Sequence, residues 1–290
     1  MLTLLSSDLF LRAFVGATLV AVVSAPVGYF LVLRAQAFAA EAFTDICFAG
    51  ATGAALVGVS PLGGMVVFAL FSAAGLGALG GRARGRGVEV GMVLSFALGL
   101  GVLFLSMGRR SSPNATAAVG ILFGSLLSVQ WTDIARMLVL EGVSLAALLV
   151  MFRPLLYATV DPGSARARGV PVRAVSVAFL VVLALAAASC TLVVGALLAT
   201  ALLIAPAAAA VRVTRGPGRA MLTAAGFGLL IAWGGLLVSF VGPWRHPPAG
   251  FAFSALAALV YGIALISGRR AKPRERRRYC DGEVEGDVPR

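Results

Sequence analysis

The feature that most constrains this chain is a succession of apolar blocks, each roughly 18 to 24 residues long, the length that crosses a bilayer as a helix. Inside lipid every backbone N–H and C=O must find a partner within its own segment, which favours helices. The alternating pattern of barrel strands does not occur. Only 12% of the residues are charged, against about 25% in soluble domains, so a soluble globule is excluded. We therefore predict an all-α, polytopic helical membrane protein.

The apolar blocks predict about nine transmembrane helices, with eight and ten as alternatives. The predicted spans cover residues 10–33, 38–59, 62–81, 88–107, 134–152, 173–191, 193–211, 219–241 and 249–267. Arginine follows every odd-numbered span, and positive charge collects in cytoplasmic loops. This pattern predicts an N-terminus outside and a C-terminus in the cytoplasm, although Arg109 and Arg110 do not fit it.

Two further segments complete the predicted organisation. Residues 115–129 are apolar but short for a span, so we interpret them as a re-entrant or interfacial helix. Residues 1–268 then form a transmembrane domain, and residues 269–290 form a basic, disordered cytoplasmic tail that could touch anionic membrane lipid. Pro26 and Pro206 fall in the middle of spans and predict helix kinks, which serve either a transport path or simple packing.

Several classes of protein are excluded by what the chain lacks. No GxxxxGK[ST] motif occurs, and the only lysine is Lys272 in the predicted tail, so ATP is not bound through a P-loop. The sole histidine, His246, falls in a predicted outer loop, which leaves no Ser–His–Asp triad. The net charge of +12 sits in loops and tail rather than in a nucleic-acid patch. We expect neither an enzyme nor a permanently bound cofactor, and no nucleic-acid partner.

Acidic residues inside the apolar blocks are the candidate site. Glu41 and Asp45 are four residues apart near the start of the second span, so they share one face of a helix. Because charge is costly in a bilayer, such a pair faces a cavity, binds a cation or forms a solvated rim. Glu141 lies inside the fifth span and has either a functional or a structural role, since Arg136 could extend towards the same interface. His246 could help a metal ion to enter, but a lone loop histidine is usually incidental.

Four motifs carry a resemblance to a known family. They are residues 30–34; residues 122–127 followed by Asp133; Arg153-Pro154-Leu155 followed by Asp161-Pro162, Ala165, Ala167 and Gly169-Val170-Pro171; and residues 194–198 followed by 201–210. Together they occur in the order and spacing of one family, over nearly the whole chain. The chain resembles the permease subunits of bacterial ABC importers for zinc, manganese and iron(II).

The third motif contains a predicted surface helix. Asp161 suits the N-cap, Pro162 suits the first helical position and Gly169 is a plausible stop. From the residues alone, this segment with Arg166 and Arg168 reads as an ordinary basic cytoplasmic loop. The resemblance implies instead that residues 161–169, with Ala165 at their centre, dock a separate ABC ATPase subunit.

The resemblance also implies a transported ion and further partners. In the family, an Asp and a His at the places of Glu41 and Asp45 are metal ligands. Here both places are acidic, and two carboxylates favour hard cations such as Mn²⁺ over Zn²⁺. The implied partners are an ABC ATPase, an extracytoplasmic metal-binding protein and a second permease copy in the bacterial cell membrane. The alternatives are a proton- or ion-coupled secondary transporter that uses Glu41, Asp45 or Glu141, and a purely structural membrane subunit.

Overall fold

The computed structural model describes residues 8–78, 86–111, 120, 122, 130–214, 216–241 and 249–270. All regular structure in these ranges is helical. The helices are α2 (Asp8–Leu33), α3 (Ala37–Val57), α4 (Pro61–Ala78), α5 (Arg86–Ser111), α7 (Trp131–Val160), α8 (Pro162–Ala167), α9 (Val172–Val194), α10 (Ala196–Val213), α11 (Pro217–Val241) and α12 (Ala249–Arg270).

The predicted helical membrane fold is confirmed for the described residues. Seven helices are long and apolar enough to cross a membrane, and shorter apolar helices lie at Pro61–Gly77 and Leu198–Val213, within α4 and α10. The number of crossings, nine, stays a prediction because the two shorter helices fall below the usual spanning length.

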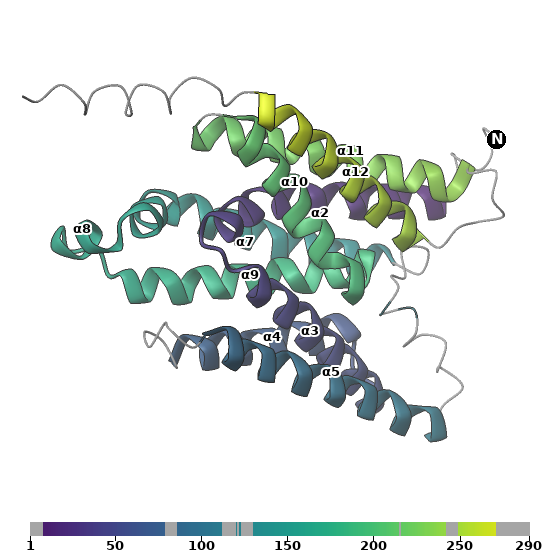
Figure 1. Ribbon diagram of the computed structural model, residues 1–290. Helices are drawn as coiled ribbons and strands as arrows, with labels where there is room; N and C mark the ends of the chain where they lie inside the picture. Colours follow the sequence, from purple (N-terminus) through teal and green to yellow (C-terminus); the bar gives the residue numbers. More distant parts are fainter. Residues whose placement is uncertain are drawn as a thin grey trace, which may run out of the picture.

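The helices form a bundle with α2, α9 and α10 at its centre (Figure 1). On one side α4 and α5 each pack against α3, and on the other α11 packs against α2 and α10, while α12 packs against α10 and α11. Helix α7 lies against α2 and α9, and the short helix α8 projects at one end of the bundle (Figure 1). Helix α3 also contacts α9 and α10, so it joins the group of α3, α4 and α5 to the central helices.

Glycine lets helices of this bundle approach until their backbones touch. A Cβ atom added at Gly64 of α4 would lie 2.2 Å from the carbonyl oxygen of Gly50 in α3, and one added at Gly50 would lie 2.4 Å from the Gly64 oxygen. The same happens between α2 and α10, where a Cβ at Gly28 would lie 2.0 Å from the Leu203 oxygen. Close contact through small residues is how helices associate in lipid, where the hydrophobic effect does not drive them together.

Helix α7 is longer than the predicted span 134–152, and this prediction was wrong at both ends. It runs from Trp131 to Val160, so Arg153-Pro154-Leu155 lies inside the helix and not in the loop that follows. The buried face explains the extension, because Leu148, Leu155 and Ala158 continue one apolar stripe against the bundle. That packing outweighs the backbone hydrogen bond that proline removes.

Pro26 and Pro206 both lie inside helices, α2 and α10. The kinks predicted at these two prolines stay predictions. Helix α9 ends and α10 begins at Gly195, whose φ is 97°. A side chain at that φ would be strained, which explains why glycine stands there. The sequence placed this boundary at residue 192, three residues too early.

Some predicted features fall outside the described residues. These are nearly all of the segment 115–129, His246, and residues 271–290 of the predicted tail. Helix α12 continues to Arg270, so the first two residues of the predicted tail are helical.

Candidate functional site

The acidic pair lies on α3, and its two members differ in burial. Asp45 is only 4% exposed, whereas Glu41 is half-buried. Between them Thr44 is fully buried and its hydroxyl donates to the Glu41 carbonyl oxygen at 2.8 Å. Phe43, directly beside Thr44, is fully buried as well. Because Asp45 is buried, a purely solvated rim does not describe this residue.

One chain offers only part of a metal site. Among the described residues, no group of three or more His, Cys, Asp or Glu side chains could hold a metal ion. Glu41 and Asp45 supply two carboxylates, and a divalent transition metal usually takes four to six ligands. A complete site therefore needs ligands from beyond these residues of one chain.

Glu141 lies on α7, apart from the acidic pair. It is 2% exposed, shares a side-chain hydrogen bond with Ser189 of α9, and its second carboxylate oxygen has no partner in the described part of the chain. A guanidinium nitrogen of Arg136 lies 3.7 Å from an Asp133 carboxylate oxygen at the exposed start of the helix. Glu141 is thus held by the Ser189 hydroxyl, and its role stays a prediction.

The predicted helix after α7 is present at Pro162–Ala167. The carboxylate of Asp161 accepts hydrogen bonds from the backbone N–H of Gly163 at 2.9 Å and of Ser164 at 3.1 Å, and Pro162 occupies the first turn. The Ser164 hydroxyl together with these two N–H groups lowers the pKa of Asp161, because all three bonds favour the ionised form. The helix ends at Ala167 with Arg168 as its C-cap, and Gly169 follows with a φ of 79°, which suits glycine.

Helix α8 rests on the bundle through one buried side chain and one arginine. Ala165 is fully buried, and the guanidinium of Arg168 donates to the Tyr157 hydroxyl at 3.0 Å while lying over that ring. Arg166, Pro162 and Gly169 are exposed. The helix is therefore fixed to the end of α7 by one face, and its other face is accessible.

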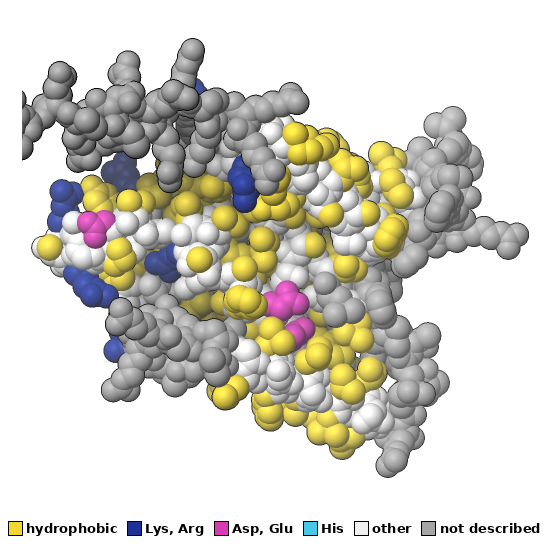
Figure 2. Space-filling model, in the orientation of Figure 1, with side chains coloured by type: hydrophobic (Ala, Val, Ile, Leu, Met, Phe, Trp, Pro, Cys, Tyr) yellow, Lys and Arg dark blue, Asp and Glu magenta, His cyan; other side chains and the backbone are white. Residues whose placement is uncertain are grey.

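Basic side chains gather at the end of the molecule that carries α8 (Figure 2). There Arg34, at the end of α2, donates from Nε to the Thr159 hydroxyl of α7 at 3.0 Å and from its terminal nitrogen to Ser176 of α9 at 3.4 Å. Sequence reasoning marked Arg34 as a loop charge and as the last residue of the first motif, and it predicted no contact for this side chain. Its hydrogen bonds join residues more than a hundred positions apart in the sequence, and no local sequence pattern predicts such contacts.

The opposite end carries a second contact that the sequence did not indicate. The Trp131 ring nitrogen at the start of α7 donates to the Asp8 carboxylate at the start of α2 at 3.1 Å, and Arg12 pairs with the same carboxylate. Gln130 and Asp133 form a capping box there. Helices α2 and α7 consequently run parallel, and both end at the arginine-rich side.

A bundle of apolar helices, with the short helix α8 at one end and the acids Asp45 and Glu141 buried inside, defines a class, the polytopic helical membrane protein. The sequence profile of the ABC 3 transport family matches residues 6–267, and the chain belongs to this family. It is therefore a multi-pass permease subunit of a bacterial ABC transporter, as its sequence motifs predicted.

Individual relatives agree with this assignment. The chain is 26% identical over 256 residues to the manganese transport system membrane protein MntC of Listeria innocua, covering 88% of this chain and 89% of that one. It is 27% identical to the high-affinity zinc uptake system membrane protein ZnuB of Haemophilus influenzae, over 91% and 99% of the two chains. Among solved structures, PsaBC from Streptococcus pneumoniae in complex with Fab gives a TM-score of 0.80 at 25% identity, over 92% and 95%.

Proposed function

We propose that this chain imports a divalent transition-metal ion, with manganese and iron(II) preferred over zinc. The burial of Asp45 on α3, one turn from Glu41, carries this proposal. A carboxylate that is 4% exposed in an apolar bundle is costly unless a cation or a proton compensates its charge. Relatives named for manganese and zinc transport support a metal ion as that cation.

The type of ligand supports the preference among metals. Both acids offer oxygen only, and oxygen ligands suit Mn²⁺, whereas imidazole and thiolate favour Zn²⁺. Cys47 and Cys190 are buried in the same bundle, yet among the described residues neither joins a cluster able to hold a metal. The sole histidine is His246, outside the two carboxylates' helix.

The incomplete ligand set supports a second permease copy. Two copies related by symmetry would bring Glu41 and Asp45 together twice and give four carboxylates around one path. An ATPase would bind α8, which one buried face fixes to α7 and whose other face is accessible. A solute-binding protein would deliver the ion at the far end, and ATP binding would switch the path between outward- and inward-facing states. In this proposal the N-terminus lies outside and the C-terminus lies in the cytoplasm.

Cellular metal uptake tests the proposal. Cells that express the chain with its ATPase and binding protein should accumulate manganese, and Glu41→Ala with Asp45→Ala should abolish uptake while the protein still elutes as a folded species in detergent. Asp45→His should shift uptake towards zinc, because imidazole suits that ion. Asp8→Asn, at an exposed helix start, is the matched control that removes a carboxylate elsewhere. Normal uptake by the double variant would move the site away from α3, with Glu141 as the next candidate.

A further inference from the structure

Glu141 is a buried acid in α7 that the proposed α3 site does not use. Its side chain is 2% exposed and faces the central helix α9, where it shares a hydrogen bond with Ser189. Its Oε2 has no hydrogen-bond partner among the residues that the structure describes. An ionised carboxylate in such a place is costly unless a cation or several donors compensate its charge. Its protonation state therefore follows from the groups around it.

The cations of α7 and of the start of α2 do not reach Glu141. Arg136 is exposed and pairs with an acid at the start of α7, and five residues turn a helix by about 140°, so its side chain leaves α7 in another direction. Arg153 is exposed and lies about 18 Å from Glu141 along the helix axis. Arg12 of α2 lies over the ring of Trp131, which is about 15 Å from Glu141 along α7.

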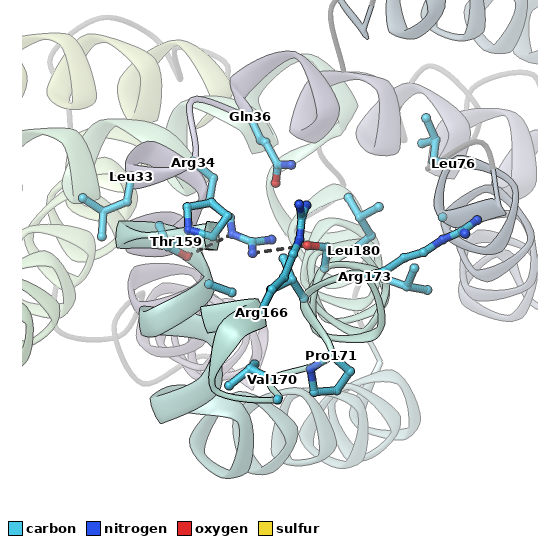
Figure 3. A pocket seen from close by; sticks show the side chains of 17 residues that line it. Leu33, Arg34, Gln36, Leu76, Thr159, Arg166, Val170, Pro171, Arg173 and Leu180 are labelled. Atoms are coloured by element: carbon cyan, nitrogen blue, oxygen red, sulfur yellow. Dashed lines mark hydrogen bonds between the residues drawn. The ribbon is translucent and has the colours of Figure 1, made fainter. Parts of the chain in front are cut away.

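Helices α2, α8 and α9 pack against α7, and their other cations lie at the α8 end of the bundle. These are Arg34, Arg166, Arg168 and Arg173. All but Arg168 line a cavity of about 850 Å³ beside α8 (Figure 3). Arg34 donates to the Thr159 hydroxyl, and Thr159 is about 27 Å from Glu141 along α7. Arg173 is about 24 Å from Ser189 along α9, so neither arginine forms an ion pair with Glu141.

The Ser189 hydroxyl has one proton, and it donates this proton to its own helix. Its Oγ lies 3.3 Å from the Leu185 carbonyl oxygen that accepts the bond. A hydroxyl that has used its proton in this way can only accept a further hydrogen bond. Glu141 then supplies the proton of the bond between the two side chains, which a neutral carboxylic acid can do and a carboxylate cannot. Cys190 lies within electrostatic reach of Glu141, but a thiol brings no positive charge.

We propose that Glu141 holds a proton at neutral pH and that its carboxyl group donates to the Ser189 hydroxyl, which fixes α7 against α9. Helix α7 leads directly into α8, and α9 packs against α3, which carries Glu41 and Asp45. The contact therefore connects the helix that precedes the proposed docking segment to a neighbour of the proposed metal ligands. Glu141 is a positioning residue for transport and not a metal ligand, and this part of the inference rests on the proposed function.

Infrared spectroscopy of the purified full chain in detergent tests the proton directly. A carboxylic acid has a carbonyl band that a carboxylate lacks, so the wild type at neutral pH should show an acid band that Glu141→Gln loses. Asp133→Asn removes an ion-paired acid at the start of the same helix, and this matched control should keep the band. Ser189→Ala should move the band to higher wavenumber, because the acid loses its hydrogen-bond acceptor. Identical acid bands in the wild type and Glu141→Gln would overturn the proposal, and an unmoved band in Ser189→Ala would overturn the contact.

Manganese uptake by cells that also express the ATPase and the binding protein tests the positioning role. Glu141→Gln should leave uptake unchanged, because its neutral amide N–H can donate to Ser189 from the same place. Glu141→Leu and Ser189→Ala each remove one partner and should lower uptake about tenfold, the scale of losing one buried hydrogen bond.

The uptake results separate a neutral acid from a charged one. Loss of uptake in a folded Glu141→Gln protein would overturn the proposal, because the charge would then be required. Full uptake by both Glu141→Leu and Ser189→Ala would refute the positioning role, and Ser189→Ala alone decides this point if Glu141→Leu does not fold. If the wild type takes up no manganese, the proposed function fails, while the infrared band still decides whether Glu141 holds a proton.

Discussion

The contact between Gly50 and Gly64 makes a quantitative prediction about the position of α3. Alanine at Gly64 would place its Cβ 2.2 Å from the Gly50 carbonyl oxygen and 2.5 Å from the Cβ of Ala54. Ordinary contact begins at about 3.4 Å, so α3 and α4 would have to separate by about 1.2 Å, the difference between 3.4 and 2.2 Å. The obstacle is backbone, which cannot rotate away as a side chain can.

The expected cost of Gly64→Ala is about 2 kcal/mol. Overpacking a close contact costs about 1–3 kcal/mol, and a gap of about 0.5–1 Å forfeits a quarter to a half of each neighbouring dispersion contact. By the scaling of domains of about 150–250 residues, this lowers Tm by about 4–8 °C. Asp45 lies five residues from Gly50, about 7.5 Å along the helix axis, so manganese uptake should fall as α3 moves.

The matched control is Gly75→Ala on the same helix, where an added Cβ meets nothing within 4 Å. Alanine there should leave Tm unchanged or raise it slightly, because alanine is the better helix former. Thermal unfolding of both variants in the same detergent compares the two sites. Equal Tm values for Gly64→Ala and Gly75→Ala would refute the backbone contact between α3 and α4.

Three further predictions concern the end of the bundle that carries α8. A cysteine reporter at Gly163 should label from the cytoplasm, and labelling from outside would refute both the topology and the docking role. Because hydrogen bonds lower the pKa of Asp161, the cap that its carboxylate forms is fully present above the ordinary carboxyl pKa and is lost only as pH falls through the lowered value. Hydrogen exchange of residues 163–164 should therefore be faster in Asp161→Ala from neutral to mildly acidic pH, and an unchanged rate would contradict the cap. Arg168→Glu should uncouple a co-purified ATPase from metal uptake, whereas Arg136→Glu, on the opposite end of α7, should not; equal effects would refute docking at α8.

Much of this fold follows from local chemistry. The long apolar blocks predicted most of the helices, and Asp161-Pro162 with Gly169 predicted both ends of α8, because caps act within a few residues. The end of α7 could not be predicted in this way. Pro154 reads as a stop signal, and only the buried stripe of Leu155 and Ala158 against the bundle keeps the helix intact.

The candidate site, too, could be predicted from the sequence only in part. Spacing alone put Glu41 and Asp45 on one face of α3, but the burial that distinguishes them depends on α4, α5, α9 and α10 packing around that helix. The contacts of Arg34 with Thr159 and Ser176, and therefore the cavity beside α8, join three helices from distant parts of the chain. Residue patterns within one helix carry no information about such contacts.

Electron paramagnetic resonance of bound Mn²⁺ tests most directly whether the α3 carboxylates hold the ion. The assembled transporter is loaded with Mn²⁺, and electron spin-echo modulation reports any nitrogen ligand of the metal. The wild type should show no imidazole nitrogen coupling, because both proposed ligands are carboxylates. Asp45→His should gain such a coupling, since the new imidazole would replace a carboxylate in the coordination sphere. Bound Mn²⁺ with no nitrogen coupling in Asp45→His would contradict the account, because Asp45 would then not touch the ion.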